Sequence, residues 1–230
     1  MYKGRFIVFD GNDGSGKQTQ AKLLADALVL QGKIVHSIDF PRYETNQMGK
    51  LLRECLDGKH GDFEHMDARI VSVLYAVDRF ESSSQIRDWL QSDCTVICDR
   101  YTTANMIHQG GKITDVQERT VFLAWLEKLE FETLQLPRPD CVIYLDVPVT
   151  VSLENLKQRN KLNNSNPDTV EQSLQYLEQS RQSAQLLAQQ MDNWHTVQCC
   201  DEHGAQRTRE AIHIDIVTLV QNYVNQHATL

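Results

Sequence analysis

Residues 11–19 read GNDGSGKQT, in which three glycines lead into Lys17. This stretch matches the pattern G-x-x-x-x-G-K, where residues without a Cβ let the backbone wrap closely around a phosphate and turn its N–H groups inward. The lysine supplies a mobile cation, and the helix expected after it adds the positive end of its dipole. We therefore predict a phosphate-binding loop (P-loop) made of Gly11, Asn12, Asp13, Gly14, Ser15, Gly16, Lys17, Gln18 and Thr19.

The sequence on either side of the loop is the context that this motif requires. An apolar run at residues 5–10 predicts a strand before it, and apolar residues with helical spacing follow it as far as Gly32. One position departs from the pattern, because the motif has Ser or Thr directly after the lysine to bind Mg²⁺, whereas this chain has Gln18 there. We therefore expect Mg²⁺ to rely on phosphates, water and carboxylates such as Asp13.

Short apolar runs alternate with longer amphipathic stretches along the rest of the chain. This alternation predicts an α/β fold of three layers, with a five-stranded parallel sheet flanked by helices, in a single domain over residues 1–230. The predicted strands are residues 5–10, 34–40, 94–99, 141–146 and 195–199. Apolar stripes with helical spacing are Ile70, Val73, Leu74, Val77 and Phe80, then Val121, Phe122, Trp125, Leu126 and Leu129, and a longer one over residues 170–191.

One polar segment interrupts this alternation. Residues 159–168 read RNKLNNSNPD, which we interpret as a loop, and Asp168 followed by Glu171 predicts the start of the next helix as a capping box. The segment is either a plain surface connection or, because Arg159 and Lys161 lie in it, a lid over phosphates at about residues 158–168.

Polar side chains follow two of the predicted strands. Asp99 and Arg100 end the third strand, and Arg42 follows the second. In parallel sheets ligands collect at the carboxyl ends of the strands, and arginine suits bidentate binding of phosphate. Asp99 is then a candidate for holding Mg²⁺-bound water or for orienting Arg100, although a surface Asp–Arg ion pair has the same pattern.

Two predicted helices carry side chains suited to a base. Tyr75 and Arg79 share one helix face, and Asn105 and Gln109 recur at helical spacing after Arg100. An aromatic ring beside an arginine can stack on a base, and amides can read its edge. Tyr75 as core filler is the simpler alternative.

The composition excludes several classes of protein. Lys and Arg total 23 against 31 Asp and Glu, for a net charge of −8, which argues against a nucleic-acid-binding surface. The apolar run near the N-terminus is too short for a signal core or a membrane span, so we expect a cytoplasmic protein. The six cysteines form no Cys-x-x-Cys pair, and we expect buried, reduced thiols rather than a zinc site.

At this point the sequence resembles the thymidylate kinases. The resemblance rests on DGNDGSGKQTQ (residues 10–20), FPR (40–42), LYAVDRFE (74–81), DRYTTANMIHQGGK (99–112) and LDVP (145–148). It implies a P-loop kinase fold and transfer of the ATP γ-phosphoryl group to thymidine 5′-monophosphate (dTMP), with Mg²⁺. It also implies small-molecule nucleotides as the ligands and a homodimer.

The resemblance assigns roles to individual residues. It implies that Asp13 contacts the deoxyribose and helps hold Mg²⁺, and that Arg42 and Arg100 surround the acceptor phosphate. Gly14 stands where some members have an arginine, which implies that the lid supplies this cation, with Arg159 as our choice. The implied catalytic residues are Asp13, Lys17, Asp99, Arg100 and Arg159, with Asp13 and Asp99 at the metal. The implied thymine-binding residues are Tyr75, which replaces the usual Phe, and Arg79, Asn105 and Gln109.

Three alternatives remain open on the sequence alone. A kinase for another nucleotide, such as deoxyuridylate (dUMP) or deoxyguanylate, would use the same loop. The sequence cannot distinguish dTMP from dUMP in particular, because the 5-methyl group by which they differ contributes only about 1–3 kcal/mol to binding. A GTP-dependent switch would usually carry Asn-Lys-x-Asp, and residues 160–163 read NKLN instead. A non-catalytic nucleotide-binding subunit is kept open by Gln18.

Overall fold

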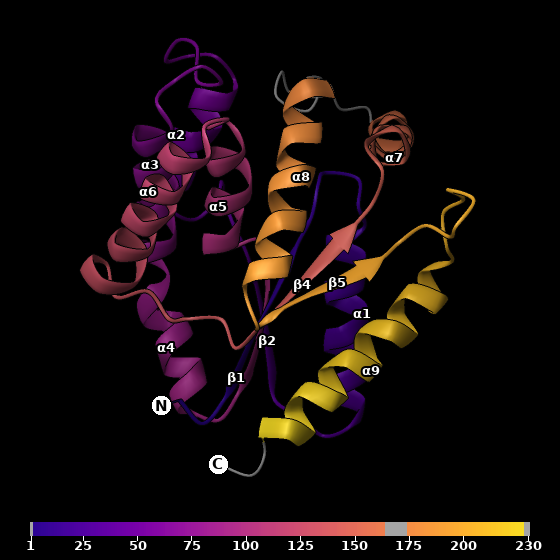
Figure 1. The fold of residues 1–230 in the computed structure, drawn as a ribbon. Helices are drawn as coiled ribbons and strands as arrows, with labels where there is room; N and C mark the ends of the chain where they lie inside the picture. Colours follow the sequence, from indigo (N-terminus) through magenta and orange to yellow (C-terminus); the bar gives the residue numbers. More distant parts are fainter. Residues whose placement is uncertain (1, 164–173, 228–230) are drawn as a thin grey trace.

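The computed structural model describes residues 2–163 and 174–227 and places a parallel five-stranded sheet at the centre (Figure 1). The strand order is β2-β3-β1-β4-β5, and every neighbouring pair is parallel. The α/β prediction is confirmed, and the predicted strand ends agree within one residue. The strands are β1 (Arg5–Asp10), β2 (Val35–Asp39), β3 (Thr95–Asp99), β4 (Cys141–Asp146) and β5 (Trp194–Gln198).

Helices cover both faces of this sheet because its strands are apolar on both sides. On β1, Phe6 and Val8 pack towards α4, α5, α6 and α8, whereas Ile7 and Phe9 pack towards α1 and α9. The helices are α1 (Lys17–Leu30), α2 (Gln47–Leu56), α3 (Ala68–Glu81), α4 (Ser83–Gln91), α5 (Thr102–Gly111), α6 (Val116–Glu127), the π-helical η1 (Lys128–Thr133), α7 (Val149–Asn163), α8 (Leu174–Gln190) and α9 (Arg209–His227).

The helix pair α2–α3 has an apolar core of its own beside the sheet. Leu52 and Cys55 of α2 pack on Val71 of α3 and on Phe63 of the connecting loop. Asp78 of α3 joins this unit to the sheet, because its carboxylate accepts from the backbone N–H of Arg42 and from the Asn46 amide. The segment after β2 is thereby fixed above the carboxyl edge of the sheet.

The helix α7 corrects the prediction of a loop from residue 159. Helical backbone continues through Arg159 and Lys161 to Asn163. The physical reason is that Arg159, Lys161 and Leu162 are good helix formers and the single Asn160 among them is tolerated in a helix, whereas a run of residues that favour turns begins only at Asn163. The rest of the proposed lid, and the predicted capping box at Asp168 and Glu171, lie outside the described residues.

Only part of each apolar stripe predicted on α3 and α6 is buried. Ile70 and Phe80 of α3 are 55% and 47% exposed, and Val121 of α6 is 61% exposed. The buried face of α3 instead carries polar groups, among them Asp78 and Arg79. The helices were therefore predicted correctly, but the direction of part of their apolar surface was not.

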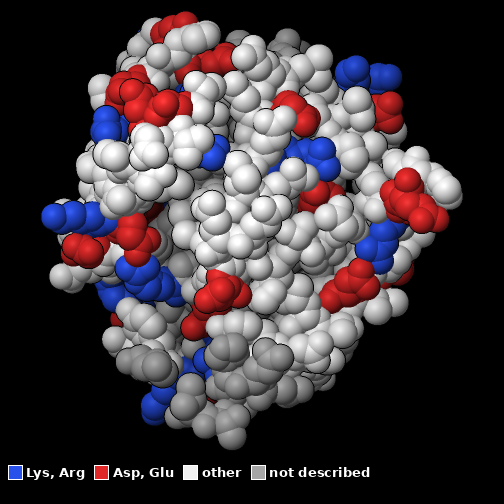
Figure 2. All heavy atoms as spheres, viewed as in Figure 1, with Lys and Arg blue, Asp and Glu red and all other residues white. Residues whose placement is uncertain are grey.

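The surface and the cysteines agree with the composition. Figure 2 shows Lys and Arg side chains interspersed with Asp and Glu on the face drawn. All six cysteines are free thiols and five of them are buried, as predicted. Within the described ranges, no helix has both the length and the apolar character needed to cross a membrane.

Candidate active site

The P-loop joins the carboxyl end of β1 to the start of α1. Gly14 and Gly16 have positive φ angles of 81° and 92°, which favour glycine. Gly14 also lies against α7: a Cβ there would be 2.2 Å from the Ser152 carbonyl oxygen, and the Asn155 amide donates to the Gly14 carbonyl at 2.9 Å. The absence of a side chain at residue 14 therefore lets α7 pack directly on the loop.

The side chain of Lys17, the first residue of α1, folds back onto the backbone of the P-loop. Its ammonium group donates to the carbonyls of Gly11 and Asn12 at 2.9 and 3.0 Å and lies 3.6 Å from the Asp13 carboxylate. Burial and the nearby Arg100 charge lower the pKa of Lys17. These carbonyl contacts hold the ammonium group of Lys17 within the loop. The Ser15 hydroxyl is buried without a hydrogen-bond partner among the described residues.

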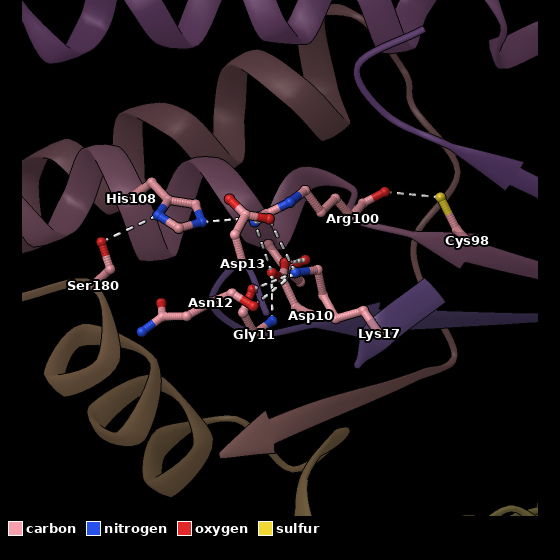
Figure 3. A network of polar contacts seen from close by, with 10 residues as sticks. Asp10, Gly11, Asn12, Asp13, Lys17, Cys98, Arg100, His108 and Ser180 are labelled. Atoms are coloured by element: carbon pink, nitrogen blue, oxygen red, sulfur yellow. Dashed lines mark hydrogen bonds and ion pairs between the residues drawn. The ribbon is translucent and has the colours of Figure 1, made fainter. Parts of the chain in front are cut away.

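Arg100 connects β3 to the P-loop (Figure 3). It follows β3 with a φ of 64°, an unfavourable conformation for a residue with a Cβ. Its Nη2 donates to the Asp13 carboxylate at 2.8 Å, and its Nη1 lies 2.6 Å from His108 Nε2. Because β1 and β3 are neighbours in the sheet, Arg100 lies beside the P-loop.

Asp10 is a residue of this site that the sequence analysis gave no role. It is fully buried, it accepts from the backbone N–H of Gly11 and from the Thr103 hydroxyl at 2.6 Å, and it lies 3.7 Å from Arg100 Nη1. A carboxylate that ends a strand immediately before a P-loop is the signal that could have found it. Asp10 fixes both the entry of the loop and the start of α5.

His108 of α5 also contacts the Arg100 guanidinium. Its Nδ1 lies 3.1 Å from the Ser180 hydroxyl, and its ring stacks on Tyr176 at 5.7 Å. Burial, followed by the charge of Arg100, lowers the pKa of His108 well below its ordinary value. The imidazole is therefore neutral, so that Nε2 accepts from Arg100 while Nδ1 donates to Ser180.

The carboxylates around these cations have pKa values shifted in opposite directions. Burial alone would raise the pKa of Asp13, but the charges of Arg100 and Lys17 outweigh it and hold this pKa well below the usual range. At Asp99 burial dominates and raises the pKa, and its Oδ1 is buried without a partner in the described part of the chain. Asp13 is thus a permanent anion of the site, and Asp99 is the less strongly paired carboxylate.

A cavity of about 110 Å³ opens beside Asp13 and Arg100. Four of the residues predicted for base binding line it: Tyr75, Arg79, Asn105 and Gln109. Gln109 Oε1 and the Tyr101 hydroxyl are buried there without hydrogen-bond partners among the described residues. Unsatisfied buried polar atoms are rare and mark where a ligand can bind.

Three predicted site residues lie at the margin of this arrangement. Among the described residues, the Arg42 guanidinium donates only to Gln85, at 3.5 Å, and Arg42 does not line the cavity. Arg159 is exposed on α7, one turn beyond the Asn155 that contacts the P-loop. Gln18 is exposed in the first turn of α1. The described residues contain no group of three His, Cys, Asp or Glu side chains that would hold a metal ion unaided.

Comparison with known proteins gives one consistent result. The family model described as thymidylate kinase matches residues 9–210. A probable thymidylate kinase of Pyrococcus abyssi is 32% identical over 96% of this chain and 97% of its own length. The chain belongs to the thymidylate kinase family. A thymidylate kinase of Alteromonas mediterranea is 28% identical over 98% of this chain and 93% of its own length.

The fold of this thymidylate kinase family member is shared with a solved structure. The thymidylate kinase of Candida albicans superposes with a TM-score of 0.73 at 20% identity, covering 98% of this chain and 94% of the other. The family implies ATP as the co-substrate. The resemblance noted in the sequence is thus confirmed at the level of the family.

His108 provides a test of the site's electrostatics. The unfolded chain binds a proton at His108 near pH 6.5, whereas the folded chain does not, so lowering the pH through this value favours unfolding. We expect His108→Gln to reduce the loss of unfolding free energy between about pH 6.5 and 5, by up to about 1.4 kcal/mol per pH unit. Urea unfolding across this range measures the slope.

His65→Gln is the matched control, because the exposed His65 has its pKa raised by a hydrogen bond to Asp62. Removing the His65 imidazole should slightly increase the loss of unfolding free energy as the pH falls, which is the opposite of the effect expected for His108→Gln. Equal slopes for the wild type and His108→Gln would show that His108 is protonated in the folded protein.

Proposed function

We propose that this chain transfers the γ-phosphoryl group of ATP to dTMP, giving ADP and dTDP. The observation that carries the proposal is the junction of two sites through Arg100. Arg100 donates to Asp13 of the P-loop and also lines the cavity that Tyr75 and Arg79 border. An acceptor whose base enters the cavity has its 5′-phosphate directed towards the loop that holds the phosphate donor.

The proposed mechanism is positioning combined with neutralisation of charge. In phosphoryl transfer there is little covalent chemistry for the protein to do. Lys17 would exchange its carbonyl contacts for the β- and γ-phosphates, and Arg100 would donate to the acceptor phosphate. Asp13 would hold Arg100 and contact the deoxyribose. Arg42 stays a prediction, which needs its guanidinium to leave Gln85.

Magnesium fits this site through its chemistry. Two cations, Lys17 and Arg100, lie among three carboxylates, those of Asp10, Asp13 and Asp99. The site therefore has no excess positive charge for incoming phosphates. Mg²⁺ bound to phosphate oxygens, and held through Asp13 and Asp99, would supply that charge and draw electron density from the transferring group. The unpartnered Oδ1 of Asp99 is the atom that favours this arrangement.

The lysine of the P-loop tests the proposal directly. Lys17→Ala should lower kcat by about 10²-fold to 10³-fold or more, because it removes a cation aimed at the transferring phosphate, while the melting temperature stays near that of the wild type. A coupled assay of ADP formation measures kcat. Lys22→Ala, on the same helix and in an exposed pair with Asp26, is the control and should be fully active. An active Lys17→Ala enzyme would remove the P-loop from the chemistry.

Arg159 is our candidate for the cation that reaches the transferring phosphoryl group. Asn155 binds the P-loop one helical turn earlier, and residues four apart share a helix face. Arg159→Ala should lower kcat by about 10²-fold or more with a smaller change in KM for dTMP, since a transition-state contact affects kcat. Lys157→Ala, also exposed on α7, is the control. Equal kcat values for Arg159→Ala and Lys157→Ala would exclude Arg159.

We also propose a homodimer formed through α3 and α6. These helices contact each other, with the Arg69 guanidinium 5.8 Å from the Trp125 ring (Figure 1). Their outer faces expose Ile70, Val73 and Phe80 on α3 and Val121 on α6. Exposed apolar side chains on two neighbouring helices are typical of an association site, and a second copy of the same face would cover them without a further partner.

Light scattering on a sizing column tests the dimer. The wild type should have about twice the chain mass of 26.4 kDa, and Ile70→Glu should shift it to the monomer, because a buried unpaired carboxylate opposes association. Leu30→Glu is the control, since Leu30 is exposed on α1 and should leave the mass unchanged. A monomeric wild type would contradict the proposal.

A further inference from the structure

Glu130 is a fully buried carboxylate that no step above uses. It is 1% exposed and lies in η1, the π-helical turn after α6. Its Oε1 accepts from Arg79 Nη2 at 2.6 Å and its Oε2 from Arg79 Nε at 2.9 Å, a bidentate pair. Its Oε1 also accepts from the Asn105 amide at 2.9 Å. Glu130 therefore binds two of the side chains that line the cavity.

These contacts fix which way the Asn105 amide faces. The side-chain nitrogen of Asn105 lies within hydrogen-bond distance of two acceptors, namely the Glu130 carboxylate and, at 3.1 Å, the Ser72 carbonyl. Only an NH₂ group can satisfy two acceptors, so Nδ2 points at them and Oδ1 is left without a partner among the described residues. Because Asn105 lines the cavity, Asn105 presents an acceptor to a ligand there.

The same carboxylate fixes what Arg79 presents. Glu130 occupies Nε and one edge of Nη2, and no described residue takes Nη1. A guanidinium has donors and no acceptor, so Arg79 presents a donor beside the acceptor of Asn105. The cavity wall thus has a fixed donor–acceptor pair.

We propose that Glu130 is a positioning residue that sets the hydrogen-bonding polarity of the base site and makes it reject cytosine. This inference rests on the proposed binding of a pyrimidine nucleotide in the cavity. Thymine and uracil offer an N3–H donor beside the O4 acceptor, which match Asn105 and Arg79. Cytosine offers an N3 acceptor beside an amino donor, so that both contacts are reversed and both polar groups of the wall lose their partners.

The backbone around Glu130 supports a positional role. The Leu134 N–H donates to the Leu129 carbonyl five residues earlier, the widened turn of a π-helix, and the Leu136 N–H donates to the Glu130 carbonyl itself. Such turns are rare and are frequent at functional sites. Glu130 is therefore held at both its backbone and its side chain.

Stability alone is a weak reason for a carboxylate in this place. Desolvation raises the pKa of Glu130 even though Arg79 and Asn105 oppose the shift. Replacing a buried ion pair by apolar residues is often neutral or stabilising, so its presence at a cavity wall favours a role in specificity.

The comparison of dUMP with dCMP tests the proposal, because these nucleotides differ only at the base edge in question. Calorimetric dissociation constants would be measured for the wild type and for Glu130→Gln, whose amide can donate to Asn105 and allow it to turn. We expect the wild type to bind dUMP at least about 100-fold more tightly than dCMP, and Glu130→Gln to reduce this ratio at least about tenfold.

Two controls separate specificity from general damage. Glu127 lies three residues before Glu130 and pairs with Arg138 on the surface. Glu127→Gln should therefore keep the wild-type ratio of dUMP to dCMP affinity. Glu130→Asp retains the carboxylate and should keep most of the ratio. A Glu130→Gln protein that is folded by its melting curve but weakens both nucleotides equally would show a structural role and overturn the proposal.

The wild type alone can also overturn it. Affinities for dUMP and dCMP within about threefold of each other would show that the wall has no fixed polarity. The proposed function fails separately, since a chain that keeps the selectivity without turning over dTMP would contradict the transfer activity and leave the role of Glu130 standing.

Discussion

The guanidinium of Arg100 between the Asp13 carboxylate and the neutral ring of His108 is the interaction on which the site depends. It joins the P-loop after β1, the turn after β3 and, through Ser180, the helix α8. Arg100 adopts a left-handed backbone conformation that costs on the order of 1 kcal/mol or more, and the network around it compensates this strain. The donor site and the acceptor cavity consequently have a fixed separation, which in-line transfer of a phosphoryl group requires.

The electrostatics follow from the same network. Three carboxylates surround the buried Lys17 and the partly buried Arg100, so the described site is not strongly positive before substrates arrive. This balance avoids the cost of burying unpaired positive charge. In the proposed mechanism, Mg²⁺ and the exposed cations of α7 would complete the neutralisation. In the cavity proposed for the acceptor, Glu130 compensates the charge of Arg79. It also determines which polar atoms of Arg79 and Asn105 can donate or accept hydrogen bonds there.

Sequence patterns predicted what depends on local chemistry. The five strands and the P-loop follow from apolar runs and from glycines, and the position of Arg100 at the sheet edge follows from parallel topology. What they missed depends on contacts between distant segments. Glu130 is 51 residues from Arg79, and nothing in its own helix distinguishes it from a surface glutamate. Likewise, the exposed side of α3 was not predictable, because part of its inner face borders the cavity beside Arg100 and not the sheet core.

The central claim is transfer from ATP to thymidylate, and ADP formation with a panel of nucleoside monophosphates tests it most directly. With ATP and Mg²⁺ held constant, dTMP, dUMP, dCMP and the purine monophosphates would each be offered as the acceptor. The account predicts strong turnover with dTMP, weaker turnover with dUMP and negligible turnover with dCMP and the purines. Preferred turnover of a purine monophosphate would contradict the assignment of the cavity to thymine, and ATP binding without turnover of any acceptor would contradict the assignment of a kinase.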